Sequence, residues 1–585
     1  MMPPALILAL VLLGASPFEG LSTTAERSDF LRTGRIGEVD ALCQRLRTLG
    51  QGCDVYGVTP EGRPLQAFVL SSVAASSAEA HKRSQRPVVA FIAGIHAGEI
   101  DGKDASTLVI KEILQGGFPG VLERITVVVI PVFNVDGHER FGRHQRPNQH
   151  GPQETGWRTT AQNLNLNRDW VKADAPETQA LLTYLNKWDP TLVVDLHVTD
   201  GAKFRHDVAL IAEPSTAQLS PLAPLAVALR DRCLRDLQRQ GHLPLDFYPA
   251  FEVDDEPASG FSVGVTPGRL THGYWALRDR LALLVETHSW RPYKERVKTT
   301  ADVMRSVLTA AQEHAGAWRQ AARAADDARR RTAGRDVILT WDNAQEAETL
   351  AFLGYSYERV SSEISGALWT RYDDNKPAVW QVPMRRALVA GKTTKAPGWG
   401  YAVPAGFASE VAARLRLHGI NFAVLEQQEV VTAQVFRAHE VSFGQRPYEG
   451  RMTAKATGAW TVEKRTLPAG SLVIGVNQPR ARLLLEMFEP DAIDSLLGWG
   501  FFNAAFEQKE YMEAYVAEEE ARRLLKNDPA LKHAFEQLLA QDPAFARDAE
   551  ARLRFFYRRT PSFDERMNLV PVYRLEGEPV HAALR

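Results

Sequence analysis

Four short apolar runs, separated by helical patterns, constrain the fold of this 585-residue chain most strongly. Val and Ile dominate the first three runs, which is typical of strands in a sheet that is covered on both faces. The runs are residues 87–95, 125–133, 191–196 and 281–285. The helical patterns between them cover residues 105–114, 177–188 and 222–239. This alternation predicts an α/β fold with a mixed, mostly parallel twisted sheet flanked by helices.

Polar residues follow each apolar run and mark a candidate site. The first run leads into His96 and Glu99, the third into His197, and the fourth into Glu286. The second run leads into residues 134–137 (Asn-Val-Asp-Gly), which we interpret mainly as a turn. Sites in open α/β sheets form beyond the carboxyl ends of the strands. We therefore expect these residues to converge in space.

The residue types at these strand ends suit a catalytic zinc ion. Such an ion takes about three protein ligands and keeps one position open for water. His96 and Glu99 supply two ligands, and His197 is the best-placed third. Zinc lowers the pKa of bound water and polarises a carbonyl group. A carboxylate must then take the water proton and pass it to the leaving amine, and Glu286 fits that role.

The ordered set of His96, Glu99, His197 and Glu286 resembles the zinc metallocarboxypeptidases, the carboxypeptidase A-like family. The resemblance covers roughly residues 25–315. It implies the fold described above, peptidase activity and one Zn²⁺ per chain. A second His-x-x-Glu pattern at 533–536 lies in a charged helical pattern with no strand before it. We interpret that copy as an exposed helix face.

Two further stretches carry the resemblance. Trp157-Arg158 resembles the family segment whose arginine stabilises the oxyanion, which is the charge that a tetrahedral intermediate develops. Asn167 and Arg168 resemble the Asn-Arg pair that holds the terminal carboxylate of the substrate. An arginine can grip a carboxylate through two parallel hydrogen bonds. Arg158 is thus implied as a catalytic residue, and Asn167 and Arg168 as substrate-binding residues.

Three features depart from the family pattern. Asn165 stands where the family often has an aspartate that supports the first zinc histidine, and Asp195 is a possible substitute. The family's substrate-capping tyrosine is not identifiable, because Tyr274 is near in sequence but misplaced. We expect the side-chain pocket within about residues 200–280, but its preference stays open.

The N-terminus indicates export. Residues 5–15 form an apolar run that is too short to span a bilayer and suits a signal peptide, although no Lys or Arg precedes it. The alternatives are an uncleaved anchor or a misassigned start. We predict a periplasmic or extracellular protein with no stable membrane span after processing. Cys43, Cys53 and Cys233 are too few for a disulfide framework, and pairing of the first two is left open.

Chain length and patterning predict more than one domain. We predict a signal peptide over 1–20, a catalytic domain over 21–333 and an accessory domain over 334–585. The accessory domain is strand-rich to about residue 480 and helical after it, and its function is unknown. The boundary follows the charged end of a long helical pattern, 298–331.

The sequence therefore predicts an exported zinc metallocarboxypeptidase that acts on a peptide or protein with a free C-terminal carboxylate. The alternatives are a cell-wall peptide amidase or N-acyl amino acid deacylase on the same zinc site, and a non-catalytic peptide-binding protein. A net charge of −2 gives no argument for nucleic acid as a partner. The natural substrate, exo or endo action and the oligomeric state are left open.

Overall fold

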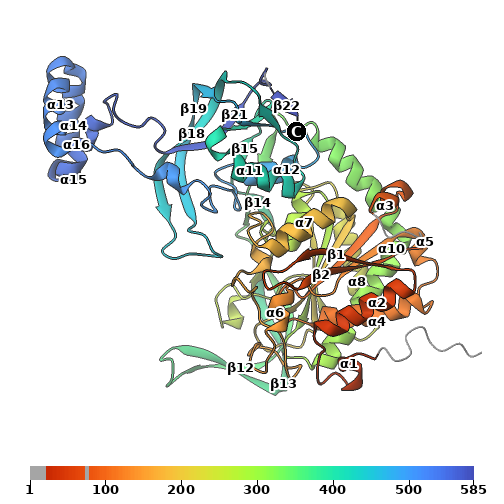
Figure 1. Ribbon diagram of the computed structural model, residues 1–585. Helices are drawn as coiled ribbons and strands as arrows, with labels where there is room; N and C mark the ends of the chain where they lie inside the picture. Colours follow the sequence, from red (N-terminus) through yellow and green to blue (C-terminus); the bar gives the residue numbers. More distant parts are fainter. Residues whose placement is uncertain (1–21, 73–77, 581, 585) are drawn as a thin grey trace, which may run out of the picture.

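The computed structural model describes residues 22–72, 78–580 and 582–584. An eight-stranded sheet organises the first part of the chain, in the order β1-β2-β4-β3-β5-β9-β6-β7 (Figure 1). The predicted signal segment lies outside the described residues. The strands are β1 (Gly52–Val58), β2 (Pro64–Leu70), β3 (Val88–Ala93), β4 (Thr126–Ile130), β5 (Leu192–Thr199), β6 (Val208–Glu213), β7 (Pro244–Leu245) and β9 (Leu281–His288).

The sheet is mixed and mostly parallel, so the predicted fold class is confirmed. Strands β4, β3, β5 and β9 run parallel to one another in the centre. Every residue of these four strands is buried, which explains why their sequences are continuous apolar runs rather than alternating patterns. Strands β1, β2 and β6 add antiparallel pairs on either side.

Helices cover both faces of this sheet. Alternate residues of β3 face two different hydrophobic clusters: Val89 and Phe91 pack in one, and Ala90 and Ile92 pack in the other. The first cluster includes apolar residues of α2 (Ile36–Thr48), α4 (Asp101–Leu114), α8 (Ala223–Arg239) and α10 (Tyr293–Arg329). The second includes residues of α7 (Pro176–Trp188) and α9 (Thr271–Leu277). Shorter helices are α1 (Thr24–Arg27), α3 (Ala78–Ser84), α5 (Val121–Arg124) and α6 (Val135–Glu139).

A seven-stranded antiparallel sheet organises the second part, in the order β19-β18-β21-β16-β20-β17-β22. Helices α11 (Ala405–His418) and α12 (Ala481–Phe488) pack beside it (Figure 1). The strands are β16 (Gly400–Val403), β17 (Ala423–Leu425), β18 (Glu429–Phe443), β19 (Ala454–Leu467), β20 (Leu472–Gly475), β21 (Leu569–Leu575) and β22 (Ala582–Leu584).

Two extensions leave the body of the molecule (Figure 1). The long hairpin of β12 (Glu348–Ser361) and β13 (Leu368–Arg385) pairs at its base with β8 (Phe261–Ser262) of the first part. A separate group of helices precedes β21: α13 (Ala514–Asn527), α14 (Pro529–Gln541), α15 (Pro543–Arg547) and α16 (Ala549–Tyr557). Short strand pairs join β10 (Asp336–Ile338) to β15 (Thr393–Lys395) and β11 (Trp341–Asn343) to β14 (Leu388–Ala390).

The two parts share an apolar core. Trp170 and Tyr274 of the first part belong to the same buried cluster as Leu415 and Leu484 of the second. Helix α11 packs against α7, and α12 packs against α9, so the second part lies on the helices that cover this face of the sheet. The proposed boundary at residues 333 and 334 separates two sheets along the sequence, but the packing across it is continuous.

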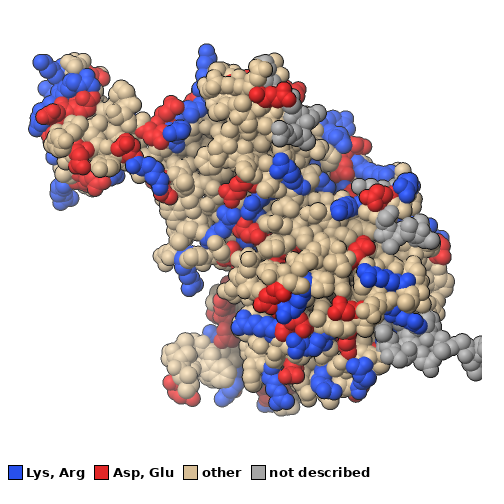
Figure 2. Space-filling model, viewed as in Figure 1, with Lys and Arg blue, Asp and Glu red and all other residues tan. Residues whose placement is uncertain are grey.

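Two observations bear on the environment of the protein. Cys43 in α2 and Cys53 in β1 form a disulfide, which answers the question that the sequence left open, and Cys233 is free and buried. Among the described residues, no helix combines the length and the apolar character needed to cross a bilayer. Figure 2 shows positive and negative side chains interspersed over the face in view.

Glu177, in the first turn of α7, gives a pH-dependent prediction. Burial raises the pKa of this fully buried carboxyl from its ordinary value of about 4.5 to about 7. A raised folded-state pKa stabilises the protein fully below pH 4.5, and this stabilisation is lost as the pH rises through 7. We expect Glu177→Gln to raise the free energy of unfolding by about 1–3 kcal/mol at pH 8 and to leave it unchanged near pH 4. Thermal melting at both pH values measures this, and an equal shift at both would contradict it.

Candidate metal centre

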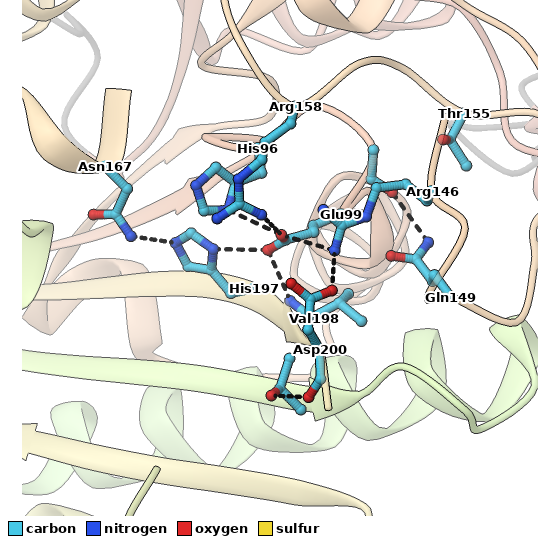
Figure 3. Close-up of polar contacts among 12 residues, drawn as sticks. His96, Glu99, Arg146, Gln149, Thr155, Arg158, Asn167, His197, Val198 and Asp200 are labelled. Atoms are coloured by element: carbon cyan, nitrogen blue, oxygen red, sulfur yellow. Dashed lines mark hydrogen bonds and ion pairs between the residues drawn. The ribbon is translucent and has the colours of Figure 1, made fainter. Parts of the chain in front are cut away.

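The structure brings His96, Glu99 and His197 together at the carboxyl ends of β3 and β5 (Figure 3). One ligand atom from each residue lies within 4.8 Å of the others, and all three side chains are buried. Glu99 lies between the two rings: its Oε1 is 2.9 Å from His96 Nδ1, and its Oε2 is 2.9 Å from His197 Nδ1. These are the three residues that the sequence predicts as metal ligands.

The Nε2 atom of each ring, on the side away from Glu99, lies against a side-chain oxygen. Asn165 Oδ1 accepts a hydrogen bond from His96 Nε2 (3.0 Å), and Asp195 Oδ1 lies 2.9 Å from His197 Nε2. Asp195 reaches His197 because residues two apart on a strand share a face. Asn165 itself therefore supports His96, and the suggestion that Asp195 replaces it there is wrong: Asp195 supports the other histidine.

This arrangement fits a zinc ion. With each Nε2 donating its proton outward, the lone pair of each Nδ1 faces a carboxylate oxygen, which is repulsive unless a cation or proton lies between them. Burial lowers the pKa of His96 to about 4, so its ring is neutral at neutral pH. Burial alone would raise the pKa of Glu99, but His96 and Arg146 hold it well below its ordinary value. Burial alone would lower the pKa of His197, but Asp195 and Glu99 hold it well above its ordinary value, so a metal ion would have to displace the proton of that ring. Two imidazoles, neutral once the metal is bound, and one carboxylate are a donor set that catalytic zinc takes.

Glu286 lies beside the three ligands on the neighbouring strand. It is paired in register with His197 across β5 and β9. Burial raises the pKa of its carboxyl to about 8. A carboxyl with a pKa near neutrality can both accept and donate a proton during one reaction cycle.

The three remaining predicted residues line the same cavity as Glu286, which has a volume of about 390 Å³. Arg158 Nη1 lies 3.4 Å from Glu99 Oε1. Asn167 and Arg168 belong to a short 3-10 helix, Leu166–Arg168, and the Thr271 backbone N–H donates to Asn167 Oδ1 (3.1 Å). Arg168 does not pair with the adjacent Asp169, since that carboxylate binds Lys172 instead.

The far wall of the cavity comes from residues 211–272, within the region where we expected the side-chain pocket. It carries charges of both signs. Asp246 is paired with Arg386 (3.0 Å) and Arg230 with Asp231 (2.8 Å). The remaining charged, aromatic or imidazole residues of this wall are Glu213, Phe247, Tyr248 and His272.

Two residues at the site escaped the sequence analysis. Arg146 bridges Glu99 (3.0 Å) and Asp200 (3.2 Å), as Figure 3 shows. It can approach because residue 98 is glycine: a Cβ there would lie 2.5 Å from Arg146 Cγ. Tyr248 lines the cavity with 41% of its surface exposed, and its hydroxyl accepts a hydrogen bond from Thr199 (3.4 Å).

Three other residues near the site make structural contacts. Tyr274 is fully buried and donates to His418, so it cannot reach a substrate. The ring of His288 stacks on Phe204, with centroids 3.9 Å apart. Asp136 lies in the first turn of α6, a short helix that Asn134 caps where the sequence predicted a turn, and it accepts from Thr59 Oγ1 (2.7 Å).

This chain is similar to several known carboxypeptidases. Residues 51–205 match the family model described as zinc carboxypeptidase, a span that holds every predicted site residue except Glu286. Carboxypeptidase 2 of Trichophyton equinum and that of Trichophyton rubrum are each 22% identical to this chain, over 75% of its length and 78% of theirs. The solved putative carboxypeptidase A from Shewanella denitrificans is 14% identical, covers 48% of this chain and 68% of its own, and gives a TM-score of 0.36. The metallo-carboxypeptidase from Pseudomonas aeruginosa is 17% identical, covers 47% of this chain and 69% of its own, and gives a TM-score of 0.34.

Proposed function

We propose that this chain, whose residues 51–205 match the zinc carboxypeptidase model, is a hydrolase of that family and releases C-terminal residues from peptides. One observation carries the proposal. The buried cluster of His96, Glu99 and His197 adjoins a cavity that Glu286 and Arg168 also line. This arrangement supports the proposal, because the side chains proposed to bind the metal, to carry the proton and to bind the carboxylate lie around one cavity.

We propose a separate role for each side chain. His96, Glu99 and His197 would hold a zinc ion, which when bound would supply a Lewis acid for the scissile carbonyl and for water. Glu286 takes the proton of the attacking water and returns it to the leaving amine. The new C–O bond forms first and gives a tetrahedral intermediate. The scissile C–N bond then breaks as the amine takes the proton from Glu286, and the products are a shortened peptide and a free amino acid.

The two arginines contact two different groups of the substrate, namely the carbonyl of the bond that is cleaved and the terminal carboxylate. Arg158 donates to the oxygen of the scissile carbonyl as negative charge develops on it. Arg168 and Asn167 hold the substrate's terminal carboxylate. Both arginines line the cavity, so a substrate inside it can reach them.

Arg168→Ala tests the carboxylate-binding role. Loss of a charge-assisted pair costs about 2–3 kcal/mol, so we expect KM for a peptide with a free C-terminus to rise about 30- to 150-fold. The ratio of kcat/KM for the free and the C-terminally amidated peptide should fall toward one. Arg335→Ala, at an exposed position, is the matched control. An unchanged ratio in Arg168→Ala would contradict the role.

Amidase or deacylase action on the same site would also present a carboxylate to Arg168, so that variant does not separate the alternatives. Release of residues from a peptide library, with and without chelator, does separate them. Chelator-sensitive loss of single C-terminal residues supports the proposal, and preferential cleavage of N-acyl amino acids or cell-wall peptides favours the alternative. Stoichiometric binding of a peptide without any cleavage would favour a non-catalytic role.

We also propose export to an oxidising compartment. The disulfide between Cys43 and Cys53 supports this, because disulfides persist mainly outside the reducing cytosol. N-terminal sequencing of the mature protein tests the proposal, and a mature chain that begins at Met1 would contradict cleavage of the signal segment.

A further inference from the structure

The residues that hold the substrate lie on an irregular segment. Residues 164–175, called the clamp segment below, include Asn165, Asn167 and Arg168, and their only helical turn is Leu166–Arg168. A segment without a ladder of backbone hydrogen bonds depends on side-chain contacts for a fixed geometry. The source of those contacts therefore bears on catalysis.

The first contact comes from the loop of residues 444–453 between β18 and β19, called the buttress loop below. Glu449 Oε2 accepts a hydrogen bond from the backbone N–H of Asn165 (2.9 Å). Asn165 Oδ1 in turn accepts from His96 Nε2 (3.0 Å) and from the backbone N–H of Asn167 (2.9 Å). A chain of hydrogen bonds thus joins the buttress loop to a predicted metal ligand and to a predicted substrate-binding residue.

The second contact lies at the other end of the clamp segment. Arg451 of the buttress loop binds Asp174 through two bonds, Nε to Oδ2 (2.6 Å) and Nη2 to Oδ1 (2.8 Å). Arg414 of α11 adds a third bond to the same carboxylate (2.8 Å). The guanidinium of Arg451 also stacks on Phe501, 3.6 Å from the ring centroid. Bidentate, stacked and partly buried pairs fix geometry in a way that isolated surface pairs do not.

A third contact holds the middle of the segment. His418 Nε2 donates to the carbonyl oxygen of Val171 (2.8 Å). Its Nδ1 accepts from the hydroxyl of Tyr274 (3.0 Å), so both ring nitrogens are used. His418 is fully buried, at the end of α11. The clamp segment is therefore held at its start, middle and end by residues at least 240 positions away in the sequence.

We propose that the buttress loop positions the active site of the first part of the chain, with Glu449 and Arg451 as positioning residues. Glu449 acts through Asn165 on the orientation of His96. Arg451 acts through Asp174 on the placement of the segment that carries Arg168. The proposal rests on the proposed function for its catalytic consequence, and it gives the second part of the chain a role in building the site.

Variants of the full-length protein separate the proposed effect of Glu449 on His96 from the proposed effect of Arg451 on substrate binding. We expect Glu449→Ala to lower kcat about tenfold, the loss typical of outer-shell support, and to release zinc to a competing chelator more readily. Glu449→Gln keeps an oxygen that accepts from Asn165, so it should retain at least about half of both properties. Arg451→Ala should instead raise KM for a free-carboxylate peptide about fivefold, with zinc retention unchanged. Glu440→Ala and Arg446→Ala, exposed on the same hairpin, are matched controls with no expected change.

Several outcomes would overturn the proposal. One is an equal loss in Glu449→Ala and Glu449→Gln. A second is a loss of activity in Glu449→Ala or Arg451→Ala that only follows a lowered melting temperature. A third is that neither Glu449→Ala nor Arg451→Ala changes kcat, KM or zinc retention. Failure of the proposed function is distinguishable, because an enzyme inactive on all peptides would still show the difference in zinc retention between the two Glu449 variants.

Discussion

Replacement of Glu286 by glutamine is expected to abolish turnover while the metal stays bound. The change keeps the shape of the side chain and removes its ability to accept a proton. General-base catalysis contributes about 10²–10⁴-fold, so we expect kcat to fall by about 10³-fold or more. KM should change little, because Glu286 does not hold the terminal carboxylate in our proposal.

The measurement combines steady-state kinetics with metal analysis of the same preparation. Glu536→Gln is the matched control, because Glu536 belongs to the second His-x-x-Glu pattern and lies exposed on α14. That variant should keep full activity. A Glu286→Gln enzyme that retains both its metal and its turnover would refute the assigned role.

Replacement of His96 by alanine is expected to remove zinc and, with it, activity. His96 supplies one of three clustered donors, so its loss leaves two. Loss of an outer hydrogen-bond partner costs about 10–100-fold in metal affinity, and loss of a ligand should exceed that. We therefore expect affinity to fall by more than about 100-fold, with activity below detection at stoichiometric zinc.

Metal content after dialysis measures this directly, and His533→Ala provides the control from the second pattern. His533 and Glu536 share the spacing of His96 and Glu99 but lie on a helix with no buried residues. Normal zinc content in His96→Ala, or zinc loss in His533→Ala, would contradict our assignment of the ligands.

The proposed metal ligands and Glu286 could be predicted from the sequence because their signals are local. Each lies at the end of a continuous apolar run, and the parallel arrangement of β3, β5 and β9 brings the ends of such runs to one edge of the sheet. The same reasoning could not find Tyr248, which lies between two very short strands. Arg146 left only an indirect signal, namely the glycine at position 98 that makes room for it.

Contacts between distant segments were beyond the reach of pattern analysis. Nothing in the residues around Glu449 or Arg451 indicates that they meet residues 165 and 174, because no periodicity connects positions so far apart. Asp195 is a different case. Because residues two apart on one strand share a face, its contact with His197 follows from the predicted strand alone.

The position of β21 in the second sheet has a consequence for synthesis of the protein. This strand lies between β18 and β16, so before residues 569–575 leave the ribosome the sheet consists of two unconnected pieces. The hairpin that carries Glu449 and Arg451 is one of those pieces. The proposed catalytic residues are translated early, whereas the hairpin that we propose steadies them joins the rest of its sheet only through β21. On that proposal, a chain that ends before β21 is expected to hold the proposed catalytic side chains and still to be a poorer peptidase than the full chain.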